Sequence, residues 1–327
     1  MHRQPVATER DDNVKKPIIQ VCVATYNQCT FIETCLRSIL DQQVEADVQV
    51  LVGDDASTDG TSGIVQALAD KYGSRLQHLR REKNVGAFAN MRELLLRGSG
   101  DYVARVDGDD YWLPRKLARQ LAYLHDHPAC SAVYTNAITV DEAGTQIGVF
   151  NDIGDARIDL GALLRRGNAL NNSSVLFRAA NTAGWIDGDQ IDFQFHLWQA
   201  RHGWLGHIGE PLTAYRVSTQ GSLVLSANAR VRELYWQAIQ SVPRELVSDD
   251  DYAHSLADFL RRVFFRSVRT SDLLLLRAWS ARVYAASPYG ATRTTALIAG
   301  AILRIGSKML AARLPFSRHH QNVLYRH

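Results

Sequence analysis

Three aspartates follow directly after a β-branched, apolar run at residues 102–106. Side chains two positions apart in an extended strand point the same way, so Asp107 and Asp109 are predicted to present two carboxylates to one point. Gly108 between them leaves room for a ligand. Two hard oxygen ligands suit Mg²⁺ or Mn²⁺ that completes its coordination shell with substrate phosphates. The alternative is a solvated Asp-Gly turn followed by an acidic helix N-terminus, and the spacing alone leaves both interpretations open. Asp110 can be either a helix cap or a ligand contact.

The elements that must position these acids alternate between strands and helices. Short β-branched runs predict buried strands, and apolar residues at helical spacing predict the helices between them. Such alternation favours a mostly parallel sheet with helices on both faces, and ligands of these sheets bind where the strands end. The predicted strands cover residues 17–24, 48–53, 76–79 and 102–106, and the predicted helices cover residues 31–42, 61–72 and 85–96.

The composition is that of a globular protein, with 327 residues of which 46% are hydrophobic and 22% charged. The four cysteines form no CxxC pair, which indicates a reducing compartment. Residues 1–16 are polar and lack an apolar core, so we expect a disordered lead-in rather than a signal peptide, and a cytoplasmic protein. Neither GxGxxG after the first strand nor GxxxxGK[ST] occurs, which disfavours dinucleotide-dependent redox chemistry and P-loop hydrolysis.

Charge divides the chain into two parts. Residues 1–226 carry 22 basic and 27 acidic side chains, whereas residues 227–327 carry 15 basic and 7 acidic ones. A Ser-Thr-Gln-Gly-Ser interruption within residues 218–228 marks the change. We therefore expect a domain at residues 17–226 that contains the acidic site, followed by a basic helical region at residues 227–327.

The apolar stretch at residues 296–312 is broken by Arg304 and Lys308 and falls short of a transmembrane span. It suits two locations. An apolar face with a cationic rim can lie in a membrane interface that contains anionic lipid. It can equally pack on the preceding domain or on a second copy of the chain as a homodimer.

Four segments, taken together in order and spacing, resemble the family 2 glycosyltransferases of GT-A fold. They read VCVATYNQ at 21–28, VGDDASTDGT at 52–61, NVGAFANM at 84–91 and YVARVDGDDYW at 102–112, and the resemblance extends to about Leu223. It implies a GT-A type, mostly parallel sheet flanked by helices, with the basic helices as an appendage. It also implies an inverting enzyme that uses Mg²⁺ or Mn²⁺ and a nucleotide-diphosphate sugar bound across the carboxyl edge of the sheet.

The resemblance implies roles for particular residues. Helix capping remains an alternative for the two acids after the second strand, and a plain turn for the asparagine after the third. For the donor, the resemblance implies Thr25 and Tyr26 in the nucleotide pocket, Asp54 or Asp55 at the base or ribose, and Asn84 nearby. It implies Asp107 at the ribose or the metal, and Asp109 as the main metal ligand.

An inverting transfer needs a base on the face of the sugar opposite the leaving phosphate. In the resembling family, the base lies in a segment of the form acid, aromatic, x-x-x-Leu, followed by Gly, Glu-Pro and Tyr-Arg. Here Asp192 is in register and Asp189 is the second choice, while Asp192 can also be the N-cap of the helix predicted at 193–201. Relatives often carry a histidine after Tyr-Arg, which this chain lacks; Arg216 is then expected to neutralise phosphate charge.

The polar loop at residues 171–174 matches the acceptor-side segment of the family, so Asn172 and Ser173 are expected to bond acceptor hydroxyls, although turn chemistry explains the loop as well. No QxxRW element is present, which disfavours a processive enzyme. We expect a glycan or lipid-linked glycan acceptor in bacterial cell-surface polysaccharide assembly, at the inner face of the cell membrane, and no nucleic-acid partner. A sugar nucleotidyltransferase and a non-catalytic nucleotide-sugar-binding or scaffolding module are the alternatives.

Overall fold

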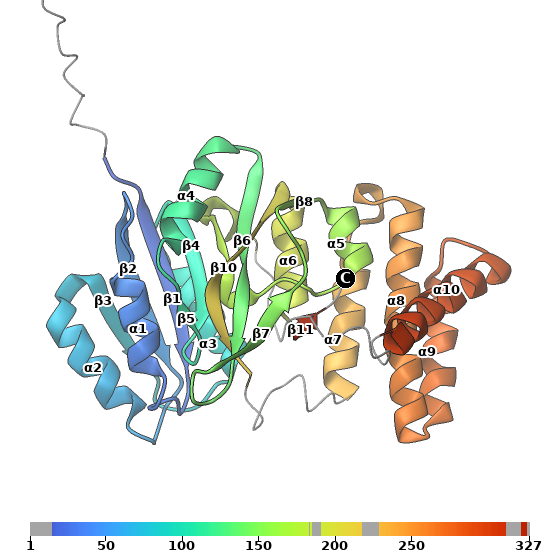
Figure 1. The fold of residues 1–327 in the computed structure, drawn as a ribbon, viewed down its shortest axis with the longest axis horizontal. Coiled ribbons are helices and arrows are strands. Elements are labelled where there is room, and N and C mark those ends of the chain that lie inside the picture. The colour runs from blue at the N-terminus through green and yellow to red at the C-terminus, as the bar shows by residue number, and fades with distance from the viewer. Residues whose placement is uncertain (1–14, 183, 185–190, 218–228, 312–321, 326–327) are drawn as a thin grey trace, which may run out of the picture.

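A curled mixed sheet runs through the molecule, with helices on both of its faces (Figure 1). The computed structural model describes residues 15–182, 184, 191–217, 229–311 and 322–325. Its strand order is β11-β7-β6-β9-β4-β1-β2-β3, and β10 pairs with β5, β6 and β8. The strands are β1 (Ile18–Thr25), β2 (Asp47–Asp54), β3 (Leu76–Arg80), β4 (Tyr102–Asp107), β5 (Tyr111–Trp112), β6 (Cys130–Val140), β7 (Gln146–Asn151), β8 (Ala156–Ile158), β9 (Leu176–Arg178), β10 (Trp204–Arg216) and β11 (Val323–Tyr325).

The four predicted strands are β1 to β4, and they pair in parallel. A helix follows each of β1, β2 and β3 and returns the chain to the same end of the sheet, as parallel pairing requires. The register sets Thr25 opposite Asp54, and Ala24 opposite Asp107. The polar ends of three strands therefore meet at one edge, as the sequence predicted.

Later strands add antiparallel pairs to this parallel centre. The β6 and β7 strands form a hairpin, and β9 runs antiparallel to both β4 and β6. A connection as short as residues 141–145 can join only antiparallel neighbours, which explains why the sheet becomes mixed beyond β4. Parallel pairing recurs later in the chain, where β10 pairs with β6 and β11 with β7, so the predicted α/β fold with a mostly parallel sheet is confirmed.

Each face of the sheet is covered by its own hydrophobic core. Apolar residues of α1, α2 and α4 pack on one face, and those of α3, α5 and α6 pack on the other. In α1 the buried residues recur every three to four positions, which is the apolar stripe of a helix lying on a sheet. The helices are α1 (Ile32–Leu40), α2 (Thr61–Tyr72), α3 (Ala87–Arg97), α4 (Lys116–Asp126), α5 (Leu160–Arg166), α6 (Asp192–Arg201), α7 (Ala229–Gln240), α8 (Asp249–Thr270), α9 (Leu273–Ala286) and α10 (Ala291–Ala311).

The C-terminal helices continue the second core outward. Helix α8 begins at a Ser248 cap that accepts from Asp251 N at 3.1 Å, with three aspartates in its first turn. It packs on α5, and α9 and α10 pack on α8. The rings of Phe259 and Trp279 lie 4.9 Å apart in the same core as the sheet residues. In the described part of the chain, no helix combines the length and the apolarity needed to cross a membrane.

Candidate active site

The acidic loop begins where β4 ends. The backbone N–H of Asp107 donates to Ser173 Oγ at 3.1 Å, which ties the strand end to the loop before β9. A Cβ atom on Gly108 would lie 2.5 Å from Gln28 Oε1 and 2.9 Å from Thr25 Cβ. This residue must therefore be glycine because the end of β1 approaches the loop so closely.

Asp110 and Arg216 fix the other side of the loop. Asp110 is 2% exposed and its Oδ1 accepts from the backbone N–H of Arg216 at 2.8 Å. Because β5 follows it and α4 begins only at Lys116, Asp110 is not a helix cap, and that alternative was wrong. The Arg216 side chain donates from Nε to the carbonyl of Asp109 at 3.0 Å and from Nη1 to the carbonyls of Asp141 and Glu142. Its predicted contact with donor phosphate stays a prediction.

The carboxylates of the loop repel one another. Burial raises the pKa of Asp107 to about 7, with Asp109 and Asp192 adding to the increase and Arg105 opposing it. Burial also raises the pKa of Asp109 and, together with its two neighbours, that of Asp110. One oxygen of Asp110, Oδ2, is buried without a hydrogen-bond partner. A divalent cation would stabilise the ionised form of these carboxylates and would give the unpartnered oxygen a partner.

The two acids at the end of β2 accept hydrogen bonds from backbone N–H groups. Asp54 is 0% exposed, and its Oδ1 accepts from Ser57 N at 2.9 Å. The carboxylate of Asp55 accepts from Val85 N and Gly86 N, both at 2.8 Å. Helix α2 follows Gly60 without a side-chain cap, so neither acid caps it. Asp55 instead holds the loop that leads into α3; a direct contact of either acid with the donor stays a prediction.

Of the other residues predicted to bind donor, two lie at the surface and one is buried. Tyr26 is 47% exposed, and Asn84 is exposed while its Oδ1 accepts from Gly86 N at 3.1 Å. Thr25 is 3% exposed and its hydroxyl donates to Gln28 Oε1 at 2.8 Å. Tyr26 and Asn84 can thus reach a ligand directly, whereas Thr25 supports the loop beside them.

Helix α6 begins at Asp192, whose side chain is 43% exposed. The N-cap position belongs to Ile191 and makes no side-chain cap bond, so Asp192 is not the cap. Arg105 Nη2 lies 3.8 Å from Asp192 Oδ1, and Arg105 is only 7% exposed with its guanidinium over the Phe195 ring. Partial burial raises the pKa of Asp192, and Arg105 opposes that increase.

Arg105 was missed by the sequence reasoning. The available signal was an arginine inside the apolar β4 run, two residues before Asp107 and therefore on the same side of the strand. The second-choice base, Asp189, lies outside the described residues. His196 is a core histidine as predicted, with 0% exposure and Nδ1 at 2.8 Å from the hydroxyl of Tyr134.

The acceptor-side loop forms a short 3₁₀ helix, Asn172–Ser174. Ser173 is used within the protein, since its Oγ accepts from Asp107 N and its carbonyl accepts from Trp112 Nε1 at 2.9 Å. Asn171 is 1% exposed, and neither its Oδ1 nor its Nδ2 has a hydrogen-bond partner. Asn172 Oδ1 is also buried without a hydrogen-bond partner. Buried amide atoms without partners mark a place where a ligand or water can bond.

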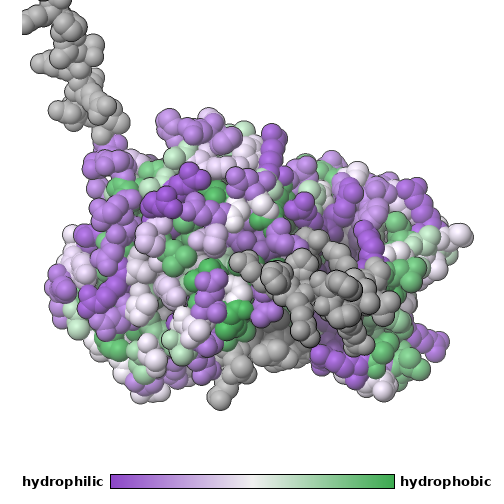
Figure 2. All heavy atoms as spheres, in the orientation of Figure 1, coloured by the Kyte–Doolittle hydropathy of each residue, from purple (hydrophilic) through white to green (hydrophobic). Residues whose placement is uncertain are grey.

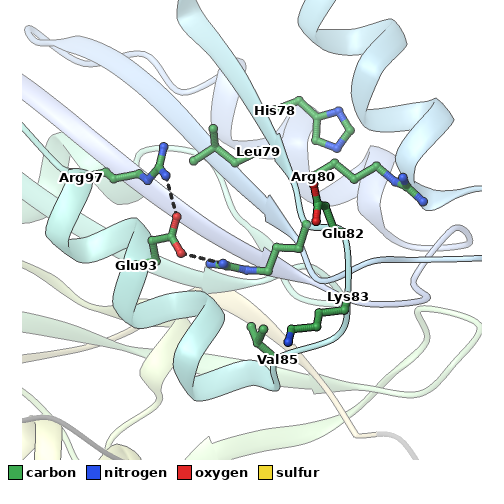
Figure 3. A pocket seen from close by; sticks show the side chains of 9 residues that line it. His78, Leu79, Arg80, Glu82, Lys83, Val85, Glu93 and Arg97 are labelled. Atoms are coloured by element: carbon green, nitrogen blue, oxygen red, sulfur yellow. Dashed lines mark hydrogen bonds and ion pairs between the residues drawn. The ribbon is translucent and has the colours of Figure 1, made fainter.

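A separate hollow of about 420 Å³ lies beyond the end of β3. Arg81 and Arg97 form ion pairs with Glu93 at 2.6 and 2.7 Å in its lining. Figure 3 shows Arg97 pointing toward Glu93. In the sheet order, β1 and β2 separate β3 from β4, so this hollow and the acidic loop lie at the ends of different strands. It is therefore a different feature from the site at Asp107 and Asp192. It is lined by His78, Leu79, Arg80, Arg81, Glu82, Lys83, Val85, Glu93 and Arg97.

Within the described ranges, no three His, Cys, Asp or Glu side chains are arranged to hold a metal ion. The remaining possibility is the one the spacing of Asp107 and Asp109 suggested, in which two carboxylates share the ion with phosphates of a substrate.

Comparison with known proteins finds similarity to glycosyltransferases. The sequence model described as glycosyl transferase family 2 matches residues 20–162. Rv1520 of Mycobacterium tuberculosis, a protein without an assigned function, is 31% identical over 201 residues, which are 60% of this chain and 58% of that protein. TuaG of Bacillus subtilis, named as a teichuronic acid biosynthesis glycosyltransferase, is 33% identical over 41% of this chain and 52% of its own length. The match thus covers little more than half of the length of each of these two relatives.

Solved structures share the fold. TarS of S. aureus, residues 1–349 with UDP-GlcNAc, has a TM-score of 0.65 at 20% identity over 86% of this chain and 83% of that one. The mannosyltransferase PcManGT of Pyrobaculum calidifontis, with GDP-Man and Mn²⁺, has a TM-score of 0.50 at 20% identity over 93% and 82%. At this identity the similarity establishes the GT-A fold and nothing finer.

Proposed function

Residues 20–162 belong to a family 2 glycosyltransferase domain, and from this premise we propose that the protein is an inverting, non-processive glycosyltransferase. It moves one sugar from a nucleotide-diphosphate donor to an acceptor hydroxyl. The name of TuaG supports a role in bacterial cell-surface polysaccharide assembly. The UDP-GlcNAc and GDP-Man held by the two similar structures support a UDP- or GDP-sugar as donor.

One observation carries the proposal. Arg105 lies on β4 two residues before Asp107, and its Nη2 is 3.8 Å from Asp192 Oδ1 at the start of α6, so the acidic loop and Asp192 belong to one site. A transferase of this class needs acids for the diphosphate and a base for the acceptor within the length of one sugar. A protein that only binds a nucleotide does not need a second acidic group such as Asp192.

Asp109 and Asp107 are the residues we assign to a divalent cation, Mg²⁺ or Mn²⁺, together with donor phosphates. The raised pKa of Asp107 and the orphaned Oδ2 of Asp110 fit such an ion, and PcManGT was solved with Mn²⁺. When bound, the ion stabilises negative charge on the departing diphosphate. Arg216 contributes by fixing the backbone of Asp109.

Asp192 is the residue we assign as base. The acceptor oxygen attacks the anomeric carbon while its proton passes to the Asp192 carboxylate. The bond from the anomeric carbon to the diphosphate oxygen breaks, and the nucleoside diphosphate leaves with the bonding electrons, which inverts the anomeric configuration. Arg105 favours the ionised form of Asp192, which is the form able to accept the proton.

On the donor side, Tyr26 and Asn84 are the exposed residues that we propose contact the nucleotide. Asp54 and Asp55 shape the loops that carry them, through their bonds to Ser57 and Gly86. A loop pinned by buried carboxylates loses little entropy when the donor binds, which favours affinity.

A membrane-facing surface would bring the enzyme to a lipid-linked acceptor. Figure 2 shows apolar side chains gathered over the end of the molecule formed by α9 and α10. Leu273 and Leu274 are 76% and 77% exposed, and Val268 is 62% exposed. Arg269 and Arg277 lie exposed beside them in sequence. Leucines rimmed by arginines suit an anionic lipid surface, and we place the protein at the inner face of the cell membrane on this basis.

The decisive experiment is a donor panel. Purified protein is incubated with UDP-glucose, UDP-GlcNAc and GDP-mannose, each with Mg²⁺, Mn²⁺ or EDTA, and release of UDP or GDP is measured. We expect metal-dependent release from one donor. Nucleotide binding by calorimetry without release from any donor would support the non-catalytic alternative instead.

A further inference from the structure

The strand β11 lies far along the chain from the catalytic residues yet joins the same sheet. It lies beside β7 (Figure 1) and runs parallel to it. Val323 is opposite Val149 and Tyr325 is opposite Asn151. Val149 N donates to the carbonyl of Asn322 at 2.9 Å. A Cβ on Gly148 would collide with that carbonyl, so the glycine is needed for the strand to dock this closely.

Docking places Tyr325 at the end of a row of aromatic rings. Its ring centroid is 4.8 Å from that of Phe150, and Phe150 is 5.2 Å from Tyr215. Tyr215 directly precedes Arg216, which anchors the acidic loop. Phe150 is 6% exposed, whereas Tyr215 and Tyr325 keep more surface. The row therefore runs from the acidic loop to Tyr325, and its two ends are accessible.

Charged groups of the site act on Tyr325. Burial raises the pKa of its phenol, Arg262 of α8 opposes that increase, and Asp192 adds to it. Arg262 Nη2 is 2.9 Å from where a Cβ of Gly167 would be, next to the polar loop that follows α5. The loop after α5 is in turn tied to the start of α6, because Asn168 N donates to the Tyr235 hydroxyl at 2.8 Å and the Tyr235 ring stacks on Phe193, the residue after Asp192, at 4.8 Å.

The same loop carries the unpartnered asparagines. Asn151, the register partner of Tyr325, donates from Nδ2 to the carbonyl of Ala169 at 3.1 Å. Two residues further on, Asn171 is 1% exposed with both amide atoms unbonded, and Asn172 Oδ1 is also unbonded. An accessible aromatic ring and unsatisfied amides, both near a proposed base, are the two kinds of group that bind sugars.

We propose that Tyr325 and the Asn171–Asn172 pair bind the acceptor sugar, a hexopyranose whose reacting hydroxyl faces Asp192. The ring of Tyr325 packs on the apolar face of the sugar, and the asparagine amides bond its hydroxyls. The inference rests on the proposed function and deepens it. It means that the region after residue 227 is part of the active site and selects the acceptor.

The test measures acceptor binding without requiring turnover. Saturation-transfer difference NMR is recorded with methyl glucoside, methyl N-acetylglucosaminide and methyl mannoside, in the presence of Mn²⁺ and saturating UDP or GDP. Full-length wild type is compared with Tyr325→Ala, Asn171→Ala and the control Leu324→Ala. Leu324 is 44% exposed on the same strand, and side chains alternate in direction along a strand, so its removal tests docking of β11 without touching the ring.

We expect at least one glycoside to bind wild type and Leu324→Ala, and its affinity to fall about tenfold or more in Tyr325→Ala and in Asn171→Ala, with UDP or GDP affinity within twofold throughout. Equal binding by Tyr325→Ala, tighter binding by it, or no glycoside binding to wild type would each overturn the inference. A parallel loss in Leu324→Ala, or a fall in nucleotide affinity, would show a structural role instead. Donor turnover by wild type separates these results from failure of the proposed function, in which no donor is cleaved.

Discussion

Arg105 Nη2 and Asp192 Oδ1 lie 3.8 Å apart, although Arg105 belongs to β4 and Asp192 to the first turn of α6. The arginine is two residues before Asp107, so β4 supplies the cation that faces the base and leads directly into the acids assigned to the metal. The gap is longer than a hydrogen bond, which leaves Asp192 free to accept a proton. The relationship makes the two acidic groups parts of one site.

Replacing the principal metal ligand should abolish metal-dependent transfer. Asp109→Asn keeps the size of the side chain and removes its charge, so we expect donor cleavage to fall roughly 10²-fold or more with Mn²⁺ present. Asp41→Asn, at an exposed acid, is the control and should behave as wild type. Unchanged cleavage with unchanged Mn²⁺ dependence in Asp109→Asn would remove this residue from the metal site.

Removing the base should separate chemistry from binding. Asp192→Asn is expected to lower turnover roughly 10²- to 10⁴-fold, because the acceptor proton then has no carboxylate to accept it. Donor affinity, measured by calorimetry, should stay within a few fold, since Asp192 is on the acceptor side. A collapse of donor affinity together with turnover would assign Asp192 to the structure of the donor site.

A substitution at Gly108 tests how closely the acidic loop approaches the end of β1. In Gly108→Ala the new methyl group would lie 2.9 Å from Thr25 Cβ, so we expect a loss of about 1–3 kcal/mol in the free energy of unfolding and weaker donor binding. The control is Gly63→Ala in α2, where nothing lies within 4 Å and alanine should stabilise by about 0.5–1 kcal/mol. Urea denaturation measures both; a neutral Gly108→Ala would contradict the close approach.

The lowered pKa of Asp59 predicts that its contribution to the stability of the folded protein depends on pH. Burial raises its pKa, but hydrogen bonds from Thr61 and Cys29 outweigh that effect and lower the pKa from 3.8 to about 2. A depressed carboxyl pKa stabilises the folded state above pH 4, and the contribution is lost as the pH falls from about 4 toward 2.

Asp59→Asn should therefore destabilise the protein near neutral pH by about 1 kcal/mol, less than the full shift implies because the side chain is exposed and screened. The difference from wild type, followed by urea denaturation, should shrink below pH 4. Asp126→Asn, with a side chain 71% exposed, should show little effect at any pH. A difference that does not change with pH would point to a steric origin.

The exposed leucines of α9 should mediate lipid binding. Leu273→Ser with Leu274→Ser is expected to reduce co-sedimentation with phosphatidylglycerol vesicles severalfold, because less apolar surface can enter the interface. Leu96→Ser, at a leucine 57% exposed on α3, is the matched control and should sediment as wild type does. Equal sedimentation of the double variant and wild type would favour a protein partner for this surface.

The sequence by itself was sufficient for the elements that depend on local patterns. Helix α2 has the predicted bounds, and the strand before the acidic loop differs by one residue. These predictions succeed because hydrophobic period and β-branching act between near neighbours. The convergence of polar strand ends also follows locally, since alternating strands and helices force a parallel sheet. Asp107 and Asp109 could therefore be singled out without a structure.

Contacts between distant segments were decided only by the tertiary structure. No local pattern says that Asp55 bonds Gly86, that Arg216 holds the acidic loop, or that Tyr325 returns to the sheet. Such contacts depend on how two faces pack, and many partners satisfy the same hydrophobic pattern. Sequence thus determined which residues could do chemistry in the first half of the chain. Packing decided which of them are occupied by the protein itself and which groups from the second half stand beside them.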